Sequence, residues 1–287
     1  MKIAVLSGKG GTGKTFVAVN LAAASAEPHS VYIDCDVEEP NGHLFFKPAK
    51  INTKPVHIKV PVVDEKLCNA CRKCVDFCKY NALALVNDKP FVFDEICHSC
   101  GGCSLICPQN AISERDKKIG EIQTGISDNV NVITGMLEPG QESGVPIIKT
   151  MLSSQEANLG LTVIDCPPGS ACTVMESIRD ADYCILVAEP TLFGVHNLNI
   201  VYDLVKFFKK PHGVVMNKCL DTDNPVEVFC HRNDMKILAK IQFNKKLALM
   251  NSKALIAARE DNLYHDLFVS LLYKVKEEVQ NEAITNS

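Results

Sequence analysis

Residues 8–15 read Gly8-Lys9-Gly10-Gly11-Thr12-Gly13-Lys14-Thr15, which matches the pattern G-x4-G-K-[ST] of a phosphate-binding loop. The loop follows the strand-like run Ile3 to Leu6 and precedes the alanine-rich, helix-like stretch Phe16 to Ala26. In this context the glycines let backbone N–H groups close on an anion, and the helix N-terminus adds partial positive charge. Lys14 is expected to reach the β and γ phosphates, and Thr15 to offer its hydroxyl to Mg²⁺.

Two later strand-like runs end in carboxylates. Val31 to Asp36 ends in Asp34 and Asp36, and Leu161 to Asp165 is followed by Cys166-Pro167-Pro168-Gly169. Ligands of open parallel sheets collect outside the carboxyl ends of the strands, so these side chains are expected near the phosphates. A single aspartate after a strand is more often a helix cap or a turn residue. Their order after a phosphate-binding loop favours a nucleotide site.

The early lysine makes the loop more specific. The run from Lys9 to Thr15 resembles the deviant phosphate-binding loop of the MinD, ParA and nitrogenase iron protein class, in which this lysine is called the signature lysine. The resemblance implies that Lys9 reaches the nucleotide of a partner subunit, and therefore that the chain forms a homodimer with two nucleotides near the interface. The alternative is a solvated lysine in a loop.

The same resemblance assigns chemistry to the polar residues. It implies that Asp36 orients the water that attacks the γ phosphate, while Lys9 and Lys14 balance the charge of the transition state. Asp165 corresponds to the Walker B aspartate, and the expected magnesium-side residues are Thr15, Asp34 and Asp165. The implied reaction is Mg-dependent ATP hydrolysis.

Two further pairs complete the expected nucleotide site. Pro168 and Gly169 correspond to the switch that senses the γ phosphate in the same class. Asn217 and Lys218, which follow the strand-like run His212 to Met216, resemble the pair that reads the base. An asparagine after a strand is also commonly a turn residue.

Eight of the fourteen cysteines fall into two copies of one spacing, C-x2-C-x2-C-x3-C. This is the pattern of a ferredoxin with two four-iron clusters, in which the fourth cysteine of each run binds the other cluster. It predicts one [4Fe-4S] cluster on Cys68, Cys71, Cys74 and Cys107, and a second on Cys97, Cys100, Cys103 and Cys78. Disulfides and zinc are the alternatives. Disulfides are rare in a reducing compartment, and zinc sites do not require a third cysteine at this spacing.

Other cysteine features are less complete. Lys79 follows Cys78 where ferredoxins usually carry proline, so we expect an altered local backbone and potential without loss of a cluster. Cys172 lies seven residues after Asp165, where the nitrogenase iron protein places a thiolate for an intersubunit cluster, but residues 135–149 contain no second cysteine. The C-terminal C-x2-C of Mrp-type and Nbp-type cluster carriers is also missing.

The cysteine runs define an insert. We expect residues 56–118 to form an inserted bacterial-type 2[4Fe-4S] ferredoxin-like domain, and residues 1–55 and 119–287 to form one P-loop ATPase domain. The expected fold is α/β, with a mostly parallel sheet and helices on both faces. A hairpin of 120–126 with 131–134 should return the chain to this sheet, before strands at 183–188, 212–216 and 237–241 and helices at 197–208 and 225–232.

Length and charge limit the possible partners. The 287 residues allow about two domains, and a formal net charge of −4 gives no support for nucleic-acid binding. No apolar run approaches the roughly 20 residues of a membrane span, and no signal peptide is evident. The C-terminal segment Asp261 to Ser287 has an apolar face but a net charge of −3, so we expect it to pack on the domain and not on a membrane. These features predict a soluble, cytoplasmic protein.

The chain as a whole resembles MinD-superfamily P-loop ATPases that contain an inserted ferredoxin domain. The resemblance implies ATP hydrolysis coupled to electron transfer or to iron–sulfur or metal-cofactor assembly, with a redox or cluster-acceptor protein as partner. Two alternatives stay open: a nucleotide-switched positioning protein like MinD or ParA, and a ferredoxin-type electron carrier with a regulatory nucleotide site.

Overall fold

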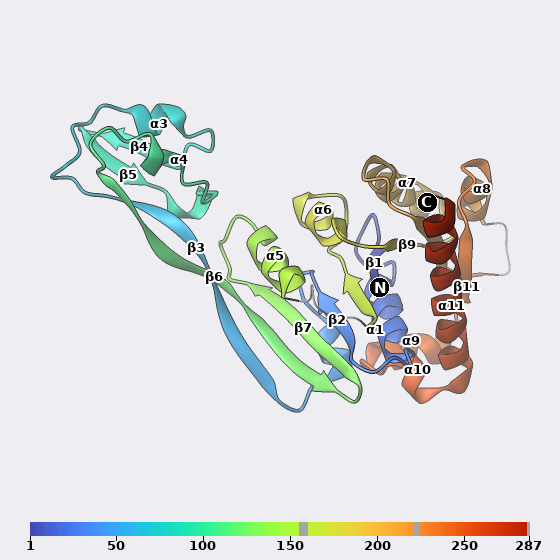
Figure 1. Ribbon diagram of the computed structural model, residues 1–287. Coiled ribbons are helices and arrows are strands. Elements are labelled where there is room, and N and C mark those ends of the chain that lie inside the picture. Colours follow the sequence, from blue (N-terminus) through green and yellow to red (C-terminus); the bar gives the residue numbers. More distant parts are fainter. Residues whose placement is uncertain (155–159, 221–223, 286–287) are drawn as a thin grey trace.

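The protein, described here by a computed structural model over residues 1–154, 160–220 and 224–285, is built on one large sheet (Figure 1). In these residues nine strands form the sheet in the order β11-β10-β9-β1-β8-β2-β7-β6-β3. From β11 to β7 all neighbours pair in parallel, whereas β6 and β3 are antiparallel. The predicted mostly parallel α/β sheet is therefore confirmed. The strands are β1 (Lys2–Leu6), β2 (Ser30–Asp34), β3 (Ile51–Val63), β6 (Ile112–Ser127), β7 (Val130–Leu137), β8 (Thr162–Asp165), β9 (Tyr183–Ala188), β10 (His212–Cys219) and β11 (Ile237–Gln242).

Helices cover both faces of the sheet. The central strands are buried on both sides, so successive residues such as Val163 and Ile164 belong to different hydrophobic cores. One core includes residues of α1 (Lys14–Ala23), α2 (Gly42–Phe46), α9 (Lys245–Ser252), α10 (Ala257–Glu260) and α11 (Asn262–Thr285). The other includes residues of α5 (Val145–Ser153), α6 (Cys172–Ile178), α7 (Leu192–Phe207) and α8 (Pro225–Arg232).

The C-terminal helix α11 belongs to this packing. Its apolar residues Phe268, Leu271 and Val275 are buried in the same core as α1. The expectation that its apolar face packs on the domain is confirmed for Leu271 and Val275, whereas Leu263 at the start of the helix is exposed. Among the helices of the described residues, none is long and apolar enough to cross a membrane.

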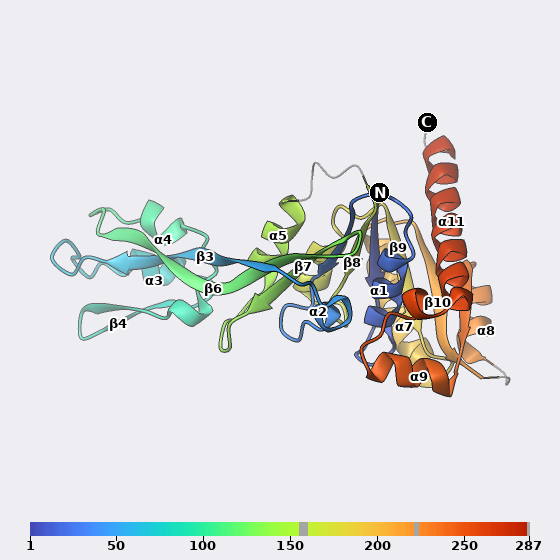
Figure 2. The same ribbon diagram turned by 90° about the horizontal axis from the view of Figure 1, so that it is seen from below.

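A two-stranded ribbon carries the cysteine-rich segment away from the sheet. β3 and β6 pair from Ile51 with Gly125 to Val63 with Ile112, while β6 pairs with β7 only from Gly120 onward. The outer half of the ribbon therefore projects beyond the sheet and holds residues 64–111 at its far end (Figures 1 and 2). A β-bulge lies between Val56 and His57, and both strands run without a break through the predicted domain boundaries at 56 and 118.

The segment at the end of the ribbon is small and has its own packing. It contains α3 (Lys73–Phe77), β4 (Leu83–Val86), β5 (Lys89–Val92), the 3₁₀ turn η1 (Asp94–Ile96) and α4 (Gly102–Leu105). Its buried core consists of Leu83, Cys103 and Ile112, with other cysteines packed around them. So small an apolar core leaves the segment dependent on other interactions for its stability.

Most predicted elements are present, with shifted ends. The hairpin, the strand 183–188 and the helix 225–232 are confirmed. α7 begins at Leu192, five residues before the predicted start, because the Thr191 hydroxyl caps it by accepting from the Gly194 N–H at 2.9 Å. Asn217 and Lys218 were expected after a strand, but both lie inside β10, which continues to Cys219 alongside β11.

Candidate nucleotide site and cysteine sites

The phosphate-binding loop connects β1 to α1 and has the backbone that its glycines permit. Gly11 and Gly13 have φ angles of +79° and +94°, in the left-handed region that side chains disfavour. A Cβ atom on Gly13 would also lie 2.1 Å from Nδ2 of Asn217. The hydroxyl of Thr12 is buried and has no hydrogen-bond partner among the described residues. A bound phosphate would supply that partner.

Lys14 makes a buried ion pair with Asp165. Its Nζ lies 2.6 Å from Oδ1 of Asp165, at the end of β8. The other carboxylate oxygen accepts from the Tyr32 hydroxyl at 2.9 Å. Burial is the largest single influence on Lys14 and lowers its pKa. The charge of Asp165, its hydrogen bond to Lys14 and the charges of Asp34 and Asp36 together raise the pKa above its usual value, so the lysine stays protonated. Burial also raises the pKa of Tyr32, as does Asp165. Tyr32 is a site residue that the sequence analysis missed.

Asp34 organises the loop that follows β2. Its Oδ2 accepts from the backbone N–H groups of Asn41 and Gly42 at 3.0 and 2.8 Å, and its Oδ1 accepts from that of Asp36 at 3.2 Å. Burial, followed by repulsion from Asp165, raises the pKa of Asp34 to about 7. Asp34 thus holds the loop that carries Asp36, and its magnesium role stays a prediction.

Asp36 lies beside Lys14, and its ionised carboxylate is disfavoured by burial. Burial raises its pKa to about 6, although Lys14 opposes the rise. In a fully buried group, a rise from 3.8 to about 6 corresponds to about 3 kcal/mol. Since Asp36 remains partly exposed, solvent screening reduces the expected cost of its charge to about 1 kcal/mol.

The raised pKa of Asp36 predicts that Asp36→Asn increases the free energy of unfolding relative to the unsubstituted protein as pH rises. Because the folded-state pKa is raised, the stabilising contribution of the protonated carboxyl is complete below about pH 4 and is lost as pH rises through about 6. We therefore expect the nucleotide-free variant to gain about 1 kcal/mol relative to the unsubstituted protein between pH 4 and pH 8. Urea unfolding across this range measures the difference. If the difference in unfolding free energy between the two proteins is the same at every pH, the pKa of Asp36 is not raised.

The predicted switch and base-reading residues also reach the loop. The Gly169 N–H donates to the carbonyl of Ser7 at 2.9 Å, which places the turn containing Pro168 against the start of the loop. Asn217 Nδ2 donates to the Thr12 carbonyl at 2.8 Å. Beside them is a cavity of about 180 Å³, whose lining includes Gly13, Phe16, Asn217, Lys218, Phe243 and Asn244. A planar base adjoining the phosphates would fit this position.

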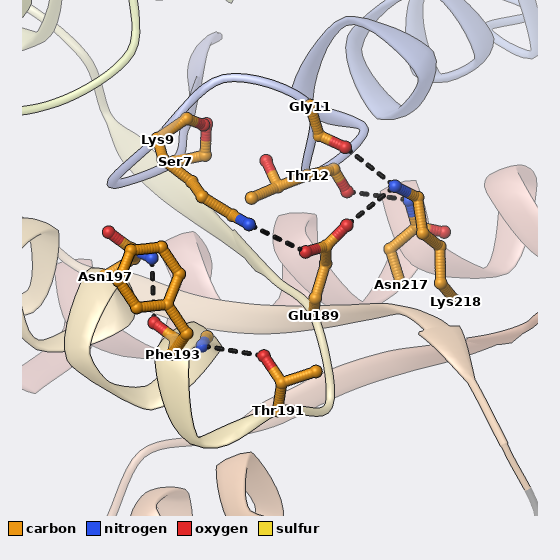
Figure 3. Close-up of polar contacts among 11 residues, drawn as sticks. Ser7, Lys9, Gly11, Thr12, Glu189, Thr191, Phe193, Asn197, Asn217 and Lys218 are labelled. Atoms are coloured by element: carbon orange, nitrogen blue, oxygen red, sulfur yellow. Dashed lines mark hydrogen bonds and ion pairs between the residues drawn. The ribbon is translucent and has the colours of Figure 1, made fainter.

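Lys9 is held within its own chain. Its Nζ lies 3.1 Å from Oε2 of Glu189, the residue after β9, and 5.1 Å from the centre of the Phe193 ring (Figure 3). Lys218 Nζ donates to the other oxygen of Glu189 at 2.6 Å and to the Gly11 carbonyl at 2.8 Å. Glu189 is a second residue that the sequence analysis missed.

The eight cysteines of the two runs surround two separate cavities. One is lined by Cys68, Cys71, Cys74 and Cys107, together with Val63, Leu85 and Ile112. The other is lined by Cys78, Cys97, Cys100 and Cys103, together with Tyr80 and His98. In both sets the fourth cysteine of one run joins the first three of the other run, as the spacing predicts. No three His, Cys, Asp or Glu side chains in residues 1–154, 160–220 and 224–285 lie close enough to hold a single metal ion.

The two cavities repeat local geometry but differ in polarity. The Ala82 N–H donates to Cys78 Sγ at 3.3 Å, and the Ala111 N–H donates to Cys107 Sγ at the same distance. Tyr80 stacks on His98 at 3.7 Å between ring centres, at the second cavity. That cavity is also lined by Lys59, Asp76, Lys79 and Glu114, whereas the first is mostly apolar.

The remaining cysteines do not complete a further site. Cys35, Cys166, Cys184, Cys219 and Cys230 are buried. Burial raises the pKa of each of these thiols, which suits small hydrophobic side chains. Cys172 is exposed at the start of α6.

Comparison with known proteins places this geometry in one family. Residues 3–256 match the family model described as CbiA, the CobQ/CobB/MinD/ParA nucleotide-binding domain. Two uncharacterised proteins of Methanocaldococcus jannaschii are similar in sequence. One is 35% identical over 76% of this chain and 78% of its own length, and the other is 30% identical over 76% and 80%.

Solved structures share the fold. The septum site-determining protein MinD of Pyrococcus horikoshii OT3, complexed with Mg-ADP, has a TM-score of 0.61 at 17% identity, covering 96% of this chain and 95% of that one. The cell division ATPase MinD of Pyrococcus furiosus has a TM-score of 0.60 at 18% identity, with 96% and 98% covered. These similarities concern the nucleotide-binding domain and carry no support for iron–sulfur clusters in residues 56–118.

Proposed function

Because the chain belongs to the CobQ/CobB/MinD/ParA nucleotide-binding family, we propose that it is a dimeric Mg-dependent ATPase whose nucleotide cycle controls two [4Fe-4S] clusters held by residues 56–118. The clusters would take part in electron transfer or in iron–sulfur or metal-cofactor assembly, with a redox or cluster-acceptor protein as partner. Residues 56–118 would form an inserted ferredoxin-type domain on the ribbon of β3 and β6.

One observation supports the cluster proposal: each cavity is lined by the first three cysteines of one run and the fourth cysteine of the other run. Cys107 lies with Cys68, Cys71 and Cys74, although Cys78 is 29 positions nearer to these three in the sequence. Burial raises the pKa of Cys74, and Cys68 and Cys107 add to the rise, which agrees with their proximity. Crossed ligation is the arrangement of two-cluster ferredoxins.

The residues present fit both groups. When bound, the clusters supply one-electron chemistry. The eight thiolates would hold them. The N–H groups of Ala82 and Ala111 donate to one sulfur at each site, and such hydrogen bonds would tune the cluster potential. At the nucleotide site, the glycines and Thr12 bind phosphate, Lys14 and Lys9 balance its charge, and Asp36 orients water.

A structural link joins the two sites. The carbonyl of Val37, next to Asp36, accepts from the Leu137 N–H at 2.8 Å. A Cβ atom on Gly144 would lie 2.2 Å from Cγ2 of Val37, so only glycine permits this contact. Gly144 is the N-cap of α5, and its neighbours at 141–143 and 145–146 line a cavity of about 160 Å³ together with Cys97, His98 and Ser99.

This contact supports coupling between nucleotide and cluster. The loop bearing Asp36 and Val37 packs on the loop before α5, which faces the cysteine loop across that cavity. If nucleotide binding favours one position of the Asp36 loop, the loop before α5 would move with it and change the shape of the cavity that it shares with the cysteine loop.

Iron and acid-labile sulfide counts on anaerobically purified protein test the cluster proposal. We expect about eight of each per chain. The electron paramagnetic resonance spectrum after dithionite reduction should report reduced four-iron clusters. A full-length, folded chain that retains stoichiometric zinc, or that takes up no iron during anaerobic reconstitution, contradicts the proposal.

The comparisons favour a second candidate, a nucleotide-switched positioning protein like MinD. The observation behind it is the fold match to MinD over 96% of the chain. Such a protein needs a site that binds a membrane or a nucleic acid. The C-terminal helix α11 instead buries apolar residues in the core of the domain. Flotation with anionic liposomes and a mobility-shift assay with duplex DNA test this candidate: ATP-dependent binding to either one supports positioning, and binding to neither rules it out.

A further inference from the structure

Glu189 lies at a junction of three elements around the phosphate-binding loop. It follows β9 directly and precedes α7, and β9 pairs with β1, the strand that leads into the loop. The Glu189 carbonyl accepts from the Thr191 N–H at 2.8 Å. Its side chain is 16% exposed. The carboxylate is therefore held in a fixed place beside the loop.

One carboxylate there serves two lysines. Oε2 pairs with Lys9 at 3.1 Å, and Oε1 pairs with Lys218 at 2.6 Å (Figure 3). Lys218 also donates to the Gly11 carbonyl at 2.8 Å. Glu189 thus ties down the first lysine of the loop directly and the middle of the loop through Lys218. Lys9 turns back onto its own chain, above the Phe193 ring.

Lys9 can leave Glu189 without exposing an unpaired charge. The Lys9 side chain is one-third exposed, so its ion pair with Glu189 is weak and can break at little cost in free energy. When it leaves, Glu189 keeps Lys218 and is not left as an unpaired, mostly buried charge. This double pairing makes the Lys9 contact a releasable one.

We propose that Glu189 is a latch that holds Lys9 inside its own protomer, and that Mg-ATP-driven pairing of two copies releases the lysine. The inference rests on the proposed function in one respect, that Lys9 must reach a nucleotide across a dimer. A latched lysine lowers the fraction of protomers competent to pair, and so weakens the apparent dimerisation constant by that fraction. The latch would keep protomers apart when nucleotide is scarce.

Glu189→Gln tests the latch, because glutamine keeps the size of the side chain but removes its charge. The protein concentration for half-maximal dimerisation with Mg-ATP, measured by analytical ultracentrifugation, should fall about two- to fivefold, the range expected for a partly exposed ion pair. Without nucleotide, amine-reactive labelling of Lys9, followed by peptide mass spectrometry, should become faster. Glu278→Gln is the matched control, since it removes an ion pair with Lys236 far from the loop.

A second variant identifies the lysine through which Glu189 acts. In a Lys218→Ala background, which keeps the pair between Lys9 and Glu189, Glu189→Gln should still lower the dimerisation concentration and speed the labelling of Lys9. The latch is wrong if Glu189→Gln leaves both dimerisation and Lys9 labelling unchanged, or if its effect disappears without Lys218. If Glu189→Gln folds poorly, the labelling rates of Lys9 and Lys218 are measured in the unsubstituted protein. The proposal is overturned if both lysines are labelled as fast as a fully exposed lysine.

Failure of the latch and failure of the proposed function are distinguishable. If the unsubstituted protein binds Mg-ATP but never dimerises at any concentration, the dimeric ATPase is wrong. If it dimerises normally and Glu189→Gln behaves like Glu278→Gln, only the latch is wrong.

Discussion

Replacing Cys107 and Cys97 together by alanine is expected to remove both clusters, so that iron falls from about eight atoms per chain to near zero. Replacing Cys107 and Cys68 together should instead leave about four. The reason is spatial: Cys107 and Cys68 line the same cavity, whereas Cys97 lines the other. The measurement is iron and sulfide per folded chain after anaerobic reconstitution.

The comparison separates crossed ligation from ligation in sequence order. If each cluster used its own run, Cys107 and Cys97 would share one cluster, and their joint replacement would leave about four irons. Cys172→Ala is the control for loss of an exposed thiol outside the runs, and should leave the count unchanged. A result in which the two double variants lose equal iron contradicts the ligand sets.

Lys14→Met is expected to abolish nucleotide binding and to destabilise the protein by about 3 to 5 kcal/mol. The variant loses the lysine that contacts phosphate, and it leaves the fully buried Asp165 without its partner at 2.6 Å. Asp165→Asn should destabilise for the converse reason. The double variant should lose much less stability than the sum of the two, since neither charge is then left unpaired.

Urea unfolding and calorimetric titration with Mg-ATP measure the two effects. Lys246→Met is the matched control: it breaks a Lys–Asp pair of similar length, 2.8 Å to Asp261, whose lysine is mostly exposed. We expect that control to leave the stability nearly unchanged and to bind ATP normally. Strictly additive losses for Lys14 and Asp165 would mean that the pair is not coupled.

The local parts of the nucleotide site are predictable from the sequence because each depends on a short pattern. The phosphate-binding loop needs only its glycines, Lys14 and the flanking strand and helix. Asp34 and Asp165 end apolar runs, and parallel strands bring such ends to one edge of the sheet. The structure places both there.

Tyr32 and Glu189 could not be found in the same way. Tyr32 sits in a continuous apolar strand and looks like a core residue, and its bond to Asp165 depends on β2 and β8 being neighbours. Glu189 looks like a turn residue before Pro190, and its bond to Lys9 depends on β9 lying beside β1. Both contacts depend on strand order, which hydrophobic periodicity does not encode.

The ribbon was missed for a different reason. Residues 113–118 of β6 read Ser-Glu-Arg-Asp-Lys-Lys, and most of them are exposed. With little of either face buried, the strand lacks the apolar alternation by which half-buried strands are recognised. Its pairing with β3 shows it to be a strand.

ATP turnover on anaerobically prepared, iron-loaded protein tests the central claim most directly. The rate is compared between dithionite-reduced and oxidised clusters, with Asp36→Ala as the inactive control. If nucleotide and cluster sites are coupled as proposed, the two rates should differ by about fivefold or more, and Asp36→Ala should abolish turnover in both states. Equal rates in the two redox states, with both clusters fully loaded, would contradict the account.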